Sequence, residues 1–426
     1  MTHSMPKLLI LAALTAAQAA WADPPGPASN RIELVCIDDH ATGYATFQSH
    51  NQKLVSNRHG IFLAYIRSRN AAYTAQQWRL VRSTDGGRHF TTVFEAADAT
   101  NPPVLETDAD DNLFLARPDF VDGHAYLYRF SAADGYAHPL VSKIPQGAAG
   151  KYAMILDRPR RQLYFFSHNN SFHTLGLDGL VRRSVILLKD GPDAALQYPS
   201  LSLTPDGTLH AAWTTVKHGV YLYWDIHHML SRDGGETWQT LRGQPVALPA
   251  IADQHGLTDR IIRDDEYEVH TWLSNFLARE GKIHFVYLAQ SKPAREHYLR
   301  IDLKSGRRDV NVWPDFKGET LELQGLDGFF ASRAIDSSCP LYCVMASQGH
   351  LACLASNDNG RTWHDHAVSD ATFHLYAVGG CRELADDGSI LGAFTDYRDS
   401  AANSGGGSVY FFRIPIRCPM APGRPS

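Results

Sequence analysis

An eight-residue motif occurs three times in this chain and constrains its fold more than any other feature. It reads Ser-x-Asp-Gly-Gly-x-Thr-Trp at 231–238, with variants at 83–90 and 356–363. Each copy follows an apolar or alternating run and precedes another, so each predicts a hairpin turn. The aspartate can accept hydrogen bonds from the turn backbone, and Gly, or Asn359 in the third copy, supplies the left-handed conformation. Three such turns indicate a repeat architecture.

The rest of the sequence has almost no helical periodicity. Short runs rich in Val, Ile, Leu, Tyr and Phe alternate with clusters of Gly, Asp, Asn and Pro, which favours an all-β protein. A chain of 426 residues built from such strands fits a β-propeller better than a single sandwich. Radial repetition avoids the long open edges that a sandwich of this size would expose.

A sequence pattern of a strand, a polar Asp/Gly turn and a second strand recurs along the chain and predicts the number of blades. It gives seven inner strand pairs, beginning at residues 51, 103, 152, 198, 271, 329 and 375. The sixth pair is the least regular, so six blades remain the alternative. The run 31–37 has no pair of its own, and we expect it to join the last blade beside 409–416 and close the ring.

The three octets resemble the Asp-box of BNR-repeat, sialidase-like β-propellers. In that family the box is a folding device on the rim, away from the active site, so the resemblance implies a structural role for all three copies. Family sialidases have six blades, whereas related BNR-type polysaccharide lyases and some rhamnosidases have seven. The strand count above agrees with seven.

Residues 1–22 have the pattern of a secretory signal peptide. Lys7 precedes an apolar run over 8–20, and Ala20-Trp21-Ala22 forms a small-x-small cleavage site. The apolar run is too short for a permanent membrane-spanning helix, and no cysteine near the cut offers a lipid anchor. We therefore expect one propeller domain over 23–426, periplasmic or secreted, monomeric and without a membrane anchor.

The charge and the cysteine content limit the classes of partner and cofactor that we expect the protein to bind. The chain has 40 Lys and Arg against 45 Asp and Glu, which predicts no nucleic-acid or membrane-surface binding. The six cysteines show no zinc-type spacing with histidines, so we expect no metal and no cofactor. Two disulfides, Cys36–Cys418 and Cys343–Cys353, are guesses among 15 possible connectivities.

The candidate site follows from the expected architecture. The loops that enter the innermost strands of a propeller line one mouth of its channel, so we examined the residues at the start of each predicted inner strand. They are rich in His and Tyr, the usual proton carriers near neutral pH. The set is His50, Gln52, Asn101, Tyr152, Tyr198, His270, Trp272, Arg333, His374 and Tyr376.

Each candidate has a functional and a structural interpretation. His50 is the first candidate for a general base, with Asn51 and Gln52 to hold sugar hydroxyls; alternatively it bonds a neighbouring blade. His270 has the equivalent place in the fifth pair. Tyr198 can act as an acid or as a sialidase nucleophile; alternatively it is a buried tyrosine with a satisfied hydroxyl.

The remaining candidates are expected to bind substrate or to pack. Trp272 can stack on a sugar ring, although a core tryptophan is more common. Arginine suits a carboxylate, and each candidate arginine could instead form an ion pair between blades: Arg67, Arg333, Arg382 and Arg398. His210 and His284, in the second strands of their pairs, are interpreted as packing residues.

Tyr198-Pro199, the phrase Asp-Gly-Thr-Leu-His at 206–210 and the octet that follows resemble a BNR subfamily that includes lyases of uronate-containing polysaccharides. The resemblance implies β-elimination on an anionic oligo- or polysaccharide. Arg333 would neutralise the uronate carboxylate, and His50 and His270 would act as base and acid in an order that stays open. Tyr198 is the alternate acid.

Three other functions remain open. A sialidase would carry a Phe/Tyr-Arg-Ile-Pro motif near its N-terminus, but here Arg413-Ile414-Pro415 lies in the final strand. A rhamnosidase-like hydrolase would use the same face of the propeller. The third possibility is a glycan-binding propeller without catalysis, because the fold alone does not decide function.

Overall fold

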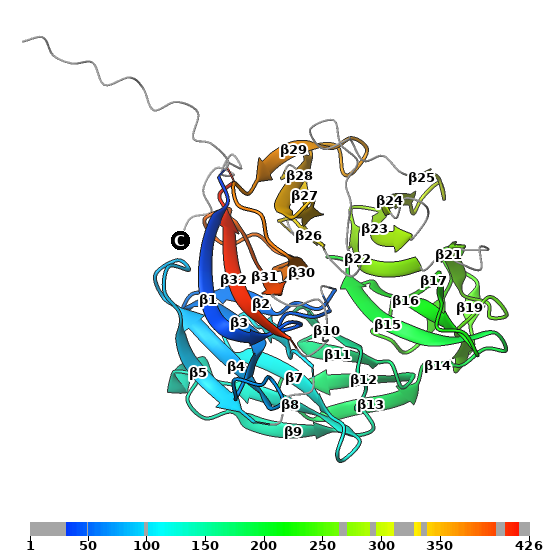
Figure 1. The fold of residues 1–426 in the computed structure, drawn as a ribbon. Coiled ribbons are helices and arrows are strands. Elements are labelled where there is room, and N and C mark those ends of the chain that lie inside the picture. The colour runs from blue at the N-terminus through cyan, green and yellow to red at the C-terminus, as the bar shows by residue number, and fades with distance from the viewer. Residues whose placement is uncertain are drawn as a thin grey trace, which may run out of the picture.

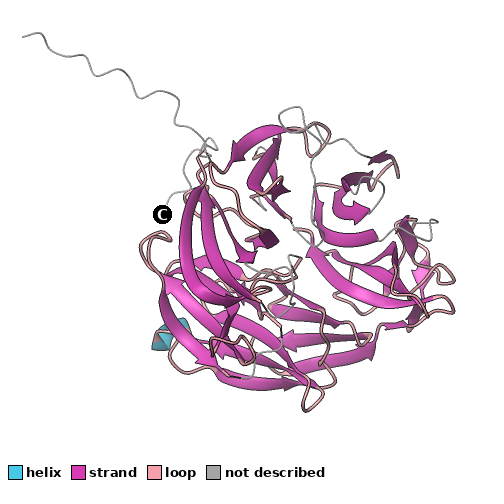
Figure 2. Cartoon of the chain, in the orientation of Figure 1, coloured by secondary structure: helices cyan, strands magenta, loops and turns pink. Residues whose placement is uncertain are grey.

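The computed structural model describes residues 31–48, 50–97, 101–263, 271–289, 295–310, 328–333, 339–397 and 405–416. Antiparallel sheets in this part of the chain are arranged around a common centre (Figure 1). Its single helical element is the 3₁₀ turn Ala132–Asp134 (Figure 2). None of its helices could span a membrane. The predicted all-β class is therefore confirmed.

Four sheets contain four strands each, in chain order. They are β6 (Val104–Thr107), β7 (Leu113–Asp119), β8 (His124–Phe130) and β9 (Leu140–Ile144); β10 (Tyr152–Asp157), β11 (Gln162–Ser167), β12 (Ser171–Gly176) and β13 (Val181–Ile186); β22 (Thr271–Arg279), β23 (Lys282–Ala289), β24 (Arg295–Asp302) and β25 (Arg308–Val310); and β26 (Phe329–Ala331), β27 (Leu341–Ser347), β28 (His350–Ser356) and β29 (His364–Val368).

The other sheets are larger or smaller. A six-stranded sheet holds β15 (Ala194–Leu203), β16 (Leu209–Lys217), β17 (Tyr223–Ser231), β18 (Trp238–Gln239) and β19 (Pro245–Val246), with β21 (Asp259–Ile262) beside β17. An eight-stranded sheet orders β30 (Leu375–Gly380), β31 (Ile390–Tyr397), β32 (Gly406–Ile414), β1 (Glu33–Thr42), β3 (Gly60–Ser68), β4 (Gln76–Ser83) and β5 (Thr91–Ala96), with β2 (Leu54–Asn57) beside β3. β14 (Leu188–Lys189) and β20 (Ala250–Ile251) form a short parallel pair.

β1 joins the two ends of the described chain. It pairs antiparallel with β32, from Glu33 opposite Arg413 to Thr42 opposite Gly406. This confirms the predicted pairing of 31–37 beside 409–416. Only Ala41, opposite Arg67, links β1 to β3, and no sheet among the described strands closes on itself.

All seven predicted inner pairs are present as antiparallel strands, from β2/β3 to β30/β31. Their first strands contact one another in chain order. The fourth pair corrects one prediction, because β15 begins at Ala194 and Tyr198 does not open it. Tyr198 instead lies in a bulge between Gln197 and Ser200, with a φ of 46°.

The three octets adopt one hydrogen-bonded turn, and they lie between β4 and β5, between β17 and β18, and between β28 and β29. The serine hydroxyl donates to aspartate Oδ1 at 2.8, 2.8 and 2.9 Å and accepts the N–H of the second glycine at 2.8, 2.8 and 2.7 Å. The same aspartate oxygen accepts a backbone N–H four residues on. Gly86, Gly234 and Asn359 are left-handed, with φ of 78°, 76° and 54°, as predicted.

Each octet also packs against an aromatic ring of another strand, in the preceding sheet for the second and third octets and in β32 of the same eight-stranded sheet for the first. A Cβ on the second glycine would lie 2.1 Å from Phe411 for Gly87, 2.7 Å from Phe172 for Gly235 and 2.0 Å from Tyr298 for Gly360. The closing aromatic packs on the same ring, with centroids 5.2, 5.6 and 5.3 Å apart. Glycine is therefore required for contact with that ring as well as for the turn.

The cysteines correct one disulfide guess. Cys353 is a free thiol. Cys343 is opposite Leu354, and Cys353 is opposite Val344, so the two cysteines project from opposite faces of the sheet. The predicted Cys343–Cys353 bridge is therefore wrong, and Cys418 lies outside the described residues.

Replacing Gly235 by alanine tests the role of the octet. Gly243 is the matched control in the same sheet, because it has a φ of 77° but no atom within 4 Å of an added Cβ. We expect Gly243→Ala to lower the free energy of unfolding by about 1–2 kcal/mol through backbone strain, and Gly235→Ala by about 1–3 kcal/mol more through the clash with Phe172. Urea unfolding measures both, and equal losses would contradict this role.

Candidate functional site

Polar side chains from three sheets meet where the inner strands begin. Gln48 and Asn101 both donate to the carbonyl oxygen of Gly150, at 2.6 and 2.8 Å. Asn51 donates to the carbonyl oxygen of Tyr152. These bonds join the loops that enter β2, β6 and β10 at one end of the centre, which we call the mouth.

His50 lies in this network as a buried, neutral imidazole. Its ring meets that of Tyr198 edge to face, with centroids 6.4 Å apart. Burial, followed by the charge of Lys53, lowers the pKa of His50 to about 3, although a hydrogen bond to the backbone of Tyr152 opposes the shift. The Nε2 atom is buried and has no hydrogen-bond partner. His50 is thus an unprotonated base with one free nitrogen.

Lys151 supplies a cation beside the Tyr198 ring. Its Nζ lies 4.7 Å from the ring centroid and donates to Gln197 Oε1 at 2.5 Å. Burial lowers the pKa of Lys151 to about 8. The Gln197 amide in turn contacts His168 Nε2 at 2.9 Å, and burial, with a smaller effect of Lys151, lowers the pKa of His168 to about 4. The Gln197 amide therefore connects the ammonium group of Lys151 to the neutral imidazole of His168.

Three phenol groups connect the mouth to solvent. The hydroxyl of Tyr198 is 3.4 Å from that of Tyr223, which is 2.6 Å from that of Tyr221. Tyr198 is buried, whereas Tyr221 is 75% exposed. Burial raises the pKa of Tyr198 to about 12, so its hydroxyl keeps its proton at neutral pH. The three linked hydroxyl groups offer a route by which solvent can replace the proton of Tyr198.

Aromatic side chains form the apolar part of the mouth. Tyr198 and Tyr223 form a small cluster against which Phe47 and Trp272 pack. Trp272 lies 5.1 Å from Tyr223, and Tyr376 stacks on Phe47 with centroids 6.0 Å apart. The structure thus brings together five predicted residues, His50, Asn101, Tyr198, Trp272 and Tyr376.

Other predicted residues lie elsewhere. Tyr152 is fully buried in the core, and its hydroxyl donates to Pro102 O at 2.6 Å, which corrects its prediction as a substrate-binding residue. Gln52 is also buried, where it bridges Leu105 O and the N–H of Arg382 at 3.2 and 3.1 Å. His270 and Arg398 lie outside the described residues.

Arg333 lies away from the mouth. It follows Ser332, which bridges Glu383, and Glu383 pairs with Arg158 at 2.8 Å after the end of β10. His50 and Lys151 instead precede β2 and β10, so Arg333 lies at the opposite end of the inner strands and is not placed beside them. Arg382 forms an ion pair with the buried carboxylate of Glu106 in another sheet, which is the alternative to binding a substrate carboxylate.

His374 is exposed, and its ring lies beside Tyr397 with centroids 5.7 Å apart.

Sequence reasoning missed four residues of the mouth: Lys151, His168, Tyr221 and Tyr223. The only available signal was the position of Lys151, directly before a predicted inner strand. Tyr223 opens the third strand of its sheet and Tyr221 lies just before it. A third strand is usually far from the centre, but here Tyr198, in the bulge of β15, contacts Tyr223.

Asp193, Asp253 and His255 are the one group of potential metal ligands in the described part of the chain, within 4.8 Å of one another. Asp253 already accepts the N–H groups of Asp193, Ala194 and His255 at 2.8, 3.1 and 3.0 Å. These bonds account for the geometry without an ion.

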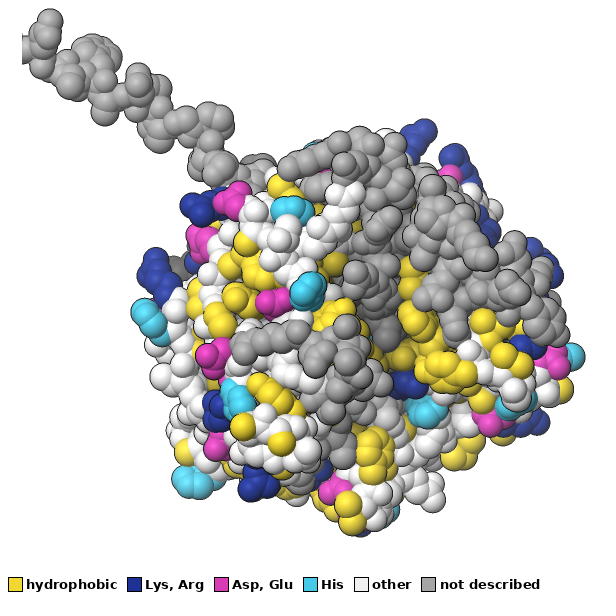
Figure 3. Space-filling model, in the orientation of Figure 1, with side chains coloured by type: hydrophobic (Ala, Val, Ile, Leu, Met, Phe, Trp, Pro, Cys, Tyr) yellow, Lys and Arg dark blue, Asp and Glu magenta, His cyan; other side chains and the backbone are white. Residues whose placement is uncertain are grey.

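On the face shown in Figure 3, basic and acidic side chains are interspersed among the described residues.

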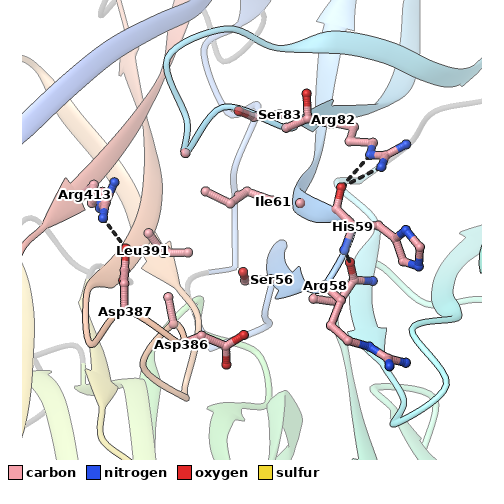
Figure 4. Close-up of a pocket in the computed structure, with 15 residues that line it drawn as sticks. Ser56, Arg58, His59, Ile61, Arg82, Ser83, Asp386, Asp387, Leu391 and Arg413 are labelled. Carbon is pink, nitrogen blue, oxygen red and sulfur yellow. Dashed lines mark hydrogen bonds and ion pairs between the residues drawn. The ribbon is translucent and has the colours of Figure 1, made fainter. Parts of the chain in front are cut away.

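A cavity of about 450 Å³ lies beside the first octet, away from the mouth (Figure 4). Its arginines already have partners: Arg58 Nε donates to Asp111 at 2.6 Å, Arg82 Nε to His59 O at 2.9 Å and Arg413 Nε to Ser389 Oγ at 2.9 Å. The cavity therefore reflects packing between turns at the two ends of the eight-stranded sheet.

Comparison with known proteins agrees with this architecture. A model of BNR repeat-containing family members matches residues 12–308. The structure of an ulvan lyase of family PL25, bound to -[GlcA(1-4)Rha3S]-, is similar with a TM-score of 0.63 and 11% identity, over 90% of this chain and 96% of that one. Polysaccharide lyase Uly1 has a TM-score of 0.59 and 9% identity, over 90% and 99%. At these identities the likeness concerns the fold. No curated protein matches the chain.

The lowered pKa of His50 predicts a loss of stability in acid. The unfolded chain protonates this histidine near its ordinary pKa of about 6.5, whereas the folded chain does so near 3. Folding therefore becomes less favourable as pH falls below about 6.5, by about 2 kcal/mol from this residue at pH ~5. His168, His173 and His284 act in the same direction.

Urea unfolding of the wild type and His50→Gln at neutral and mildly acidic pH measures the contribution of His50 to this loss of stability. We expect the variant to lose about 2 kcal/mol less than the wild type on acidification. His138→Gln, which removes an exposed histidine, should follow the wild type. The same loss in the wild type and in His50→Gln would show that His50 is not held neutral.

Proposed function

The chain belongs to the BNR repeat-containing family, and from this premise we propose that it is a carbohydrate-active enzyme that cleaves an acidic glycan by β-elimination at a uronate. The observation that carries the proposal is that neutral His50, with a free Nε2, and the Lys151 ammonium group both contact the ring of Tyr198. A base, an acid and a cation are the three groups that this reaction needs.

The proposed reaction begins at the C5 proton of the uronate. The ammonium group of Lys151 offsets the charge of the carboxylate, which makes the C5 proton more acidic. His50 Nε2 removes that proton, and the electrons of the C5–H bond form the C4–C5 double bond. We assign the cation to Lys151 in place of Arg333, because Arg333 follows β26 at the other end of the inner strands.

The bond from C4 to the leaving oxygen breaks as the double bond forms. Tyr198 donates its hydroxyl proton to that oxygen and regains one from solvent through Tyr223 and Tyr221. The raised pKa of Tyr198 keeps it protonated before the reaction. Trp272, Tyr376 and Asn101 are proposed to contact neighbouring sugar rings, with an anionic oligo- or polysaccharide as substrate.

The fold and the chemistry of the mouth support elimination over hydrolysis. The two similar structures are polysaccharide lyases, one bound to a glucuronate-containing fragment. Retaining and inverting glycosidases generally use a pair of carboxylates, and among the described residues that we name at the mouth none has a carboxylate. A sialidase or rhamnosidase-like hydrolase, and a glycan-binding propeller without catalysis, remain the alternatives that the experiment below separates.

The architecture and location complete the proposal. The seven strand groups are proposed to be seven blades, and β1 is proposed to close the ring through its pairing with β32. Residues 1–22 are proposed to direct export, so that a monomer of residues 23–426 acts in the periplasm or outside the cell.

Removal of single groups from the mouth tests the reaction. With uronate-containing polysaccharides, we expect the wild type to produce the ultraviolet absorbance of an unsaturated uronate. His50→Ala and Tyr198→Phe should lower that rate by about 10²–10⁴-fold, because each removes a proton carrier. Tyr152→Phe is the matched control, since it removes a core hydroxyl, and it should retain most activity. Release of a saturated sugar, such as free sialic acid, would contradict elimination.

The pH dependence tests the role of Lys151. Its pKa of about 8 predicts that kcat/KM falls as pH rises through 8, because the ammonium group loses its charge. Lys151→Arg should move this fall to higher pH, and Lys151→Met should abolish turnover at all pH values. Initial rates across neutral and alkaline pH provide the measurement. A fall at the same pH in Lys151→Arg would assign it to another group.

A further inference from the structure

A second cavity lies at the end of the inner strands opposite the mouth. It has a volume of about 410 Å³ and lies between the turns that follow β15 and β22. Its lining includes Asp206, His210, Arg232, Leu241, Glu280 and Leu303. His210 is fully buried, and its Nε2 has no hydrogen-bond partner. An unsatisfied buried nitrogen that lines a cavity indicates a missing partner.

The next sheet contains the same arrangement with the partner in place. His284 has the position in β23 that His210 has in β16, and Tyr298 has the position in β24 that His228 has in β17, because each pair is related by the same strand register. His284 Nδ1 contacts Tyr298 OH at 2.7 Å, as His210 Nδ1 contacts His228 Nε2 at 3.0 Å.

The two sites differ in what covers them. His284 Nε2 meets Asn359 Oδ1 at 3.2 Å, and Asn359 belongs to the octet of the following sheet. The sheet that follows His210 has no octet between β24 and β25, and Leu303 lies there instead. The octet thus fills the space beside His284, whereas the equivalent space beside His210 is part of the cavity.

The hydrogen bonds behind His210 determine whether its Nε2 donates or accepts a hydrogen bond. Asp259 Oδ2 lies 3.4 Å from His228 Nδ1, and a carboxylate can only accept, so His228 Nδ1 carries a proton. With His228 neutral, its Nε2 accepts the N–H of His210 Nδ1. His210 Nε2 is then a lone-pair acceptor, and burial holds the pKa of His210 well below its ordinary value.

The charged groups of the cavity are balanced. Burial acts to raise the pKa of Asp206, but hydrogen bonds from Thr204 and Thr208, with a smaller effect of the charge of Arg232, lower it below its ordinary value. Glu280 Oε1 accepts from Arg279 Nε at 2.8 Å. The side chains of Leu241 and Leu303 add an apolar wall. An acceptor, balanced polar groups and an apolar wall suit an uncharged ligand with several hydroxyls.

We propose that this cavity binds a neutral sugar, one hydroxyl of which donates a hydrogen bond to His210 Nε2. The bound sugar takes the place of the octet that covers the equivalent histidine in the next sheet, and its C–H face rests on Leu241 and Leu303. The site is separate from the mouth and does not depend on the reaction proposed there.

Saturation-transfer NMR with D-glucose, D-galactose and D-mannose as probes tests the site. We expect at least one of them to bind the wild type. His210→Phe keeps the ring but removes the acceptor and should weaken binding about threefold to tenfold. Leu303→Trp fills the cavity from its rim without touching His210 and should abolish binding. His284→Phe is the matched control, because Asn359 already covers that histidine, and should bind as the wild type does.

The melting temperature of each variant confirms that it folds, and Leu303→Trp decides the question if His210→Phe does not fold. Binding that survives in folded Leu303→Trp arises elsewhere on the protein and overturns the proposal. The absence of any transfer from the wild type to the three sugars also overturns it, because the cavity then holds only water.

Discussion

The antiparallel pairing of β1 with β32 is the interaction on which the rest of the structure depends. It connects the first described strand to the last, from Glu33 opposite Arg413 to Thr42 opposite Gly406, and covers strand edges that would otherwise be open. With the two ends joined, the loops before β2 and β10 and the bulge of β15 meet at one mouth. His50, Lys151 and Tyr198 are far apart in sequence and become neighbours because the first strands of the inner pairs contact one another in chain order.

The octets and the two sites follow one physical rule, that buried polar groups need partners. Each octet provides hydrogen-bond partners for its own backbone and places a glycine against an aromatic ring of another strand. The third octet also covers a buried histidine, because Asn359 contacts His284. Where no partner is present, at His50 and His210, a buried nitrogen stays free. These exceptions are where we propose that ligands bind.

The fold was largely predictable from the sequence, whereas the site was predictable only in part. Alternating apolar runs and three octets specified the strand pairs, and position before an inner strand identified His50 and, approximately, Tyr198. Position alone does not fix side-chain direction, so Tyr152 was assigned to the mouth although it points into the core. Lys151, Tyr223 and Tyr221 were missed because their role depends on the bulge in β15 and on contacts between sheets, which no local pattern reveals.

The central claim is that the C5–H bond of a uronate breaks at the mouth. The most direct measurement is turnover of a uronate-containing substrate that carries deuterium at C5, followed by mass spectrometry of the product. Elimination by His50 predicts an unsaturated product without deuterium at that carbon, because the label leaves with the proton that the base removes. A cleaved product that keeps its C5 deuterium would show that the glycosidic bond is hydrolysed and would contradict the assignment of the mouth as a lyase site.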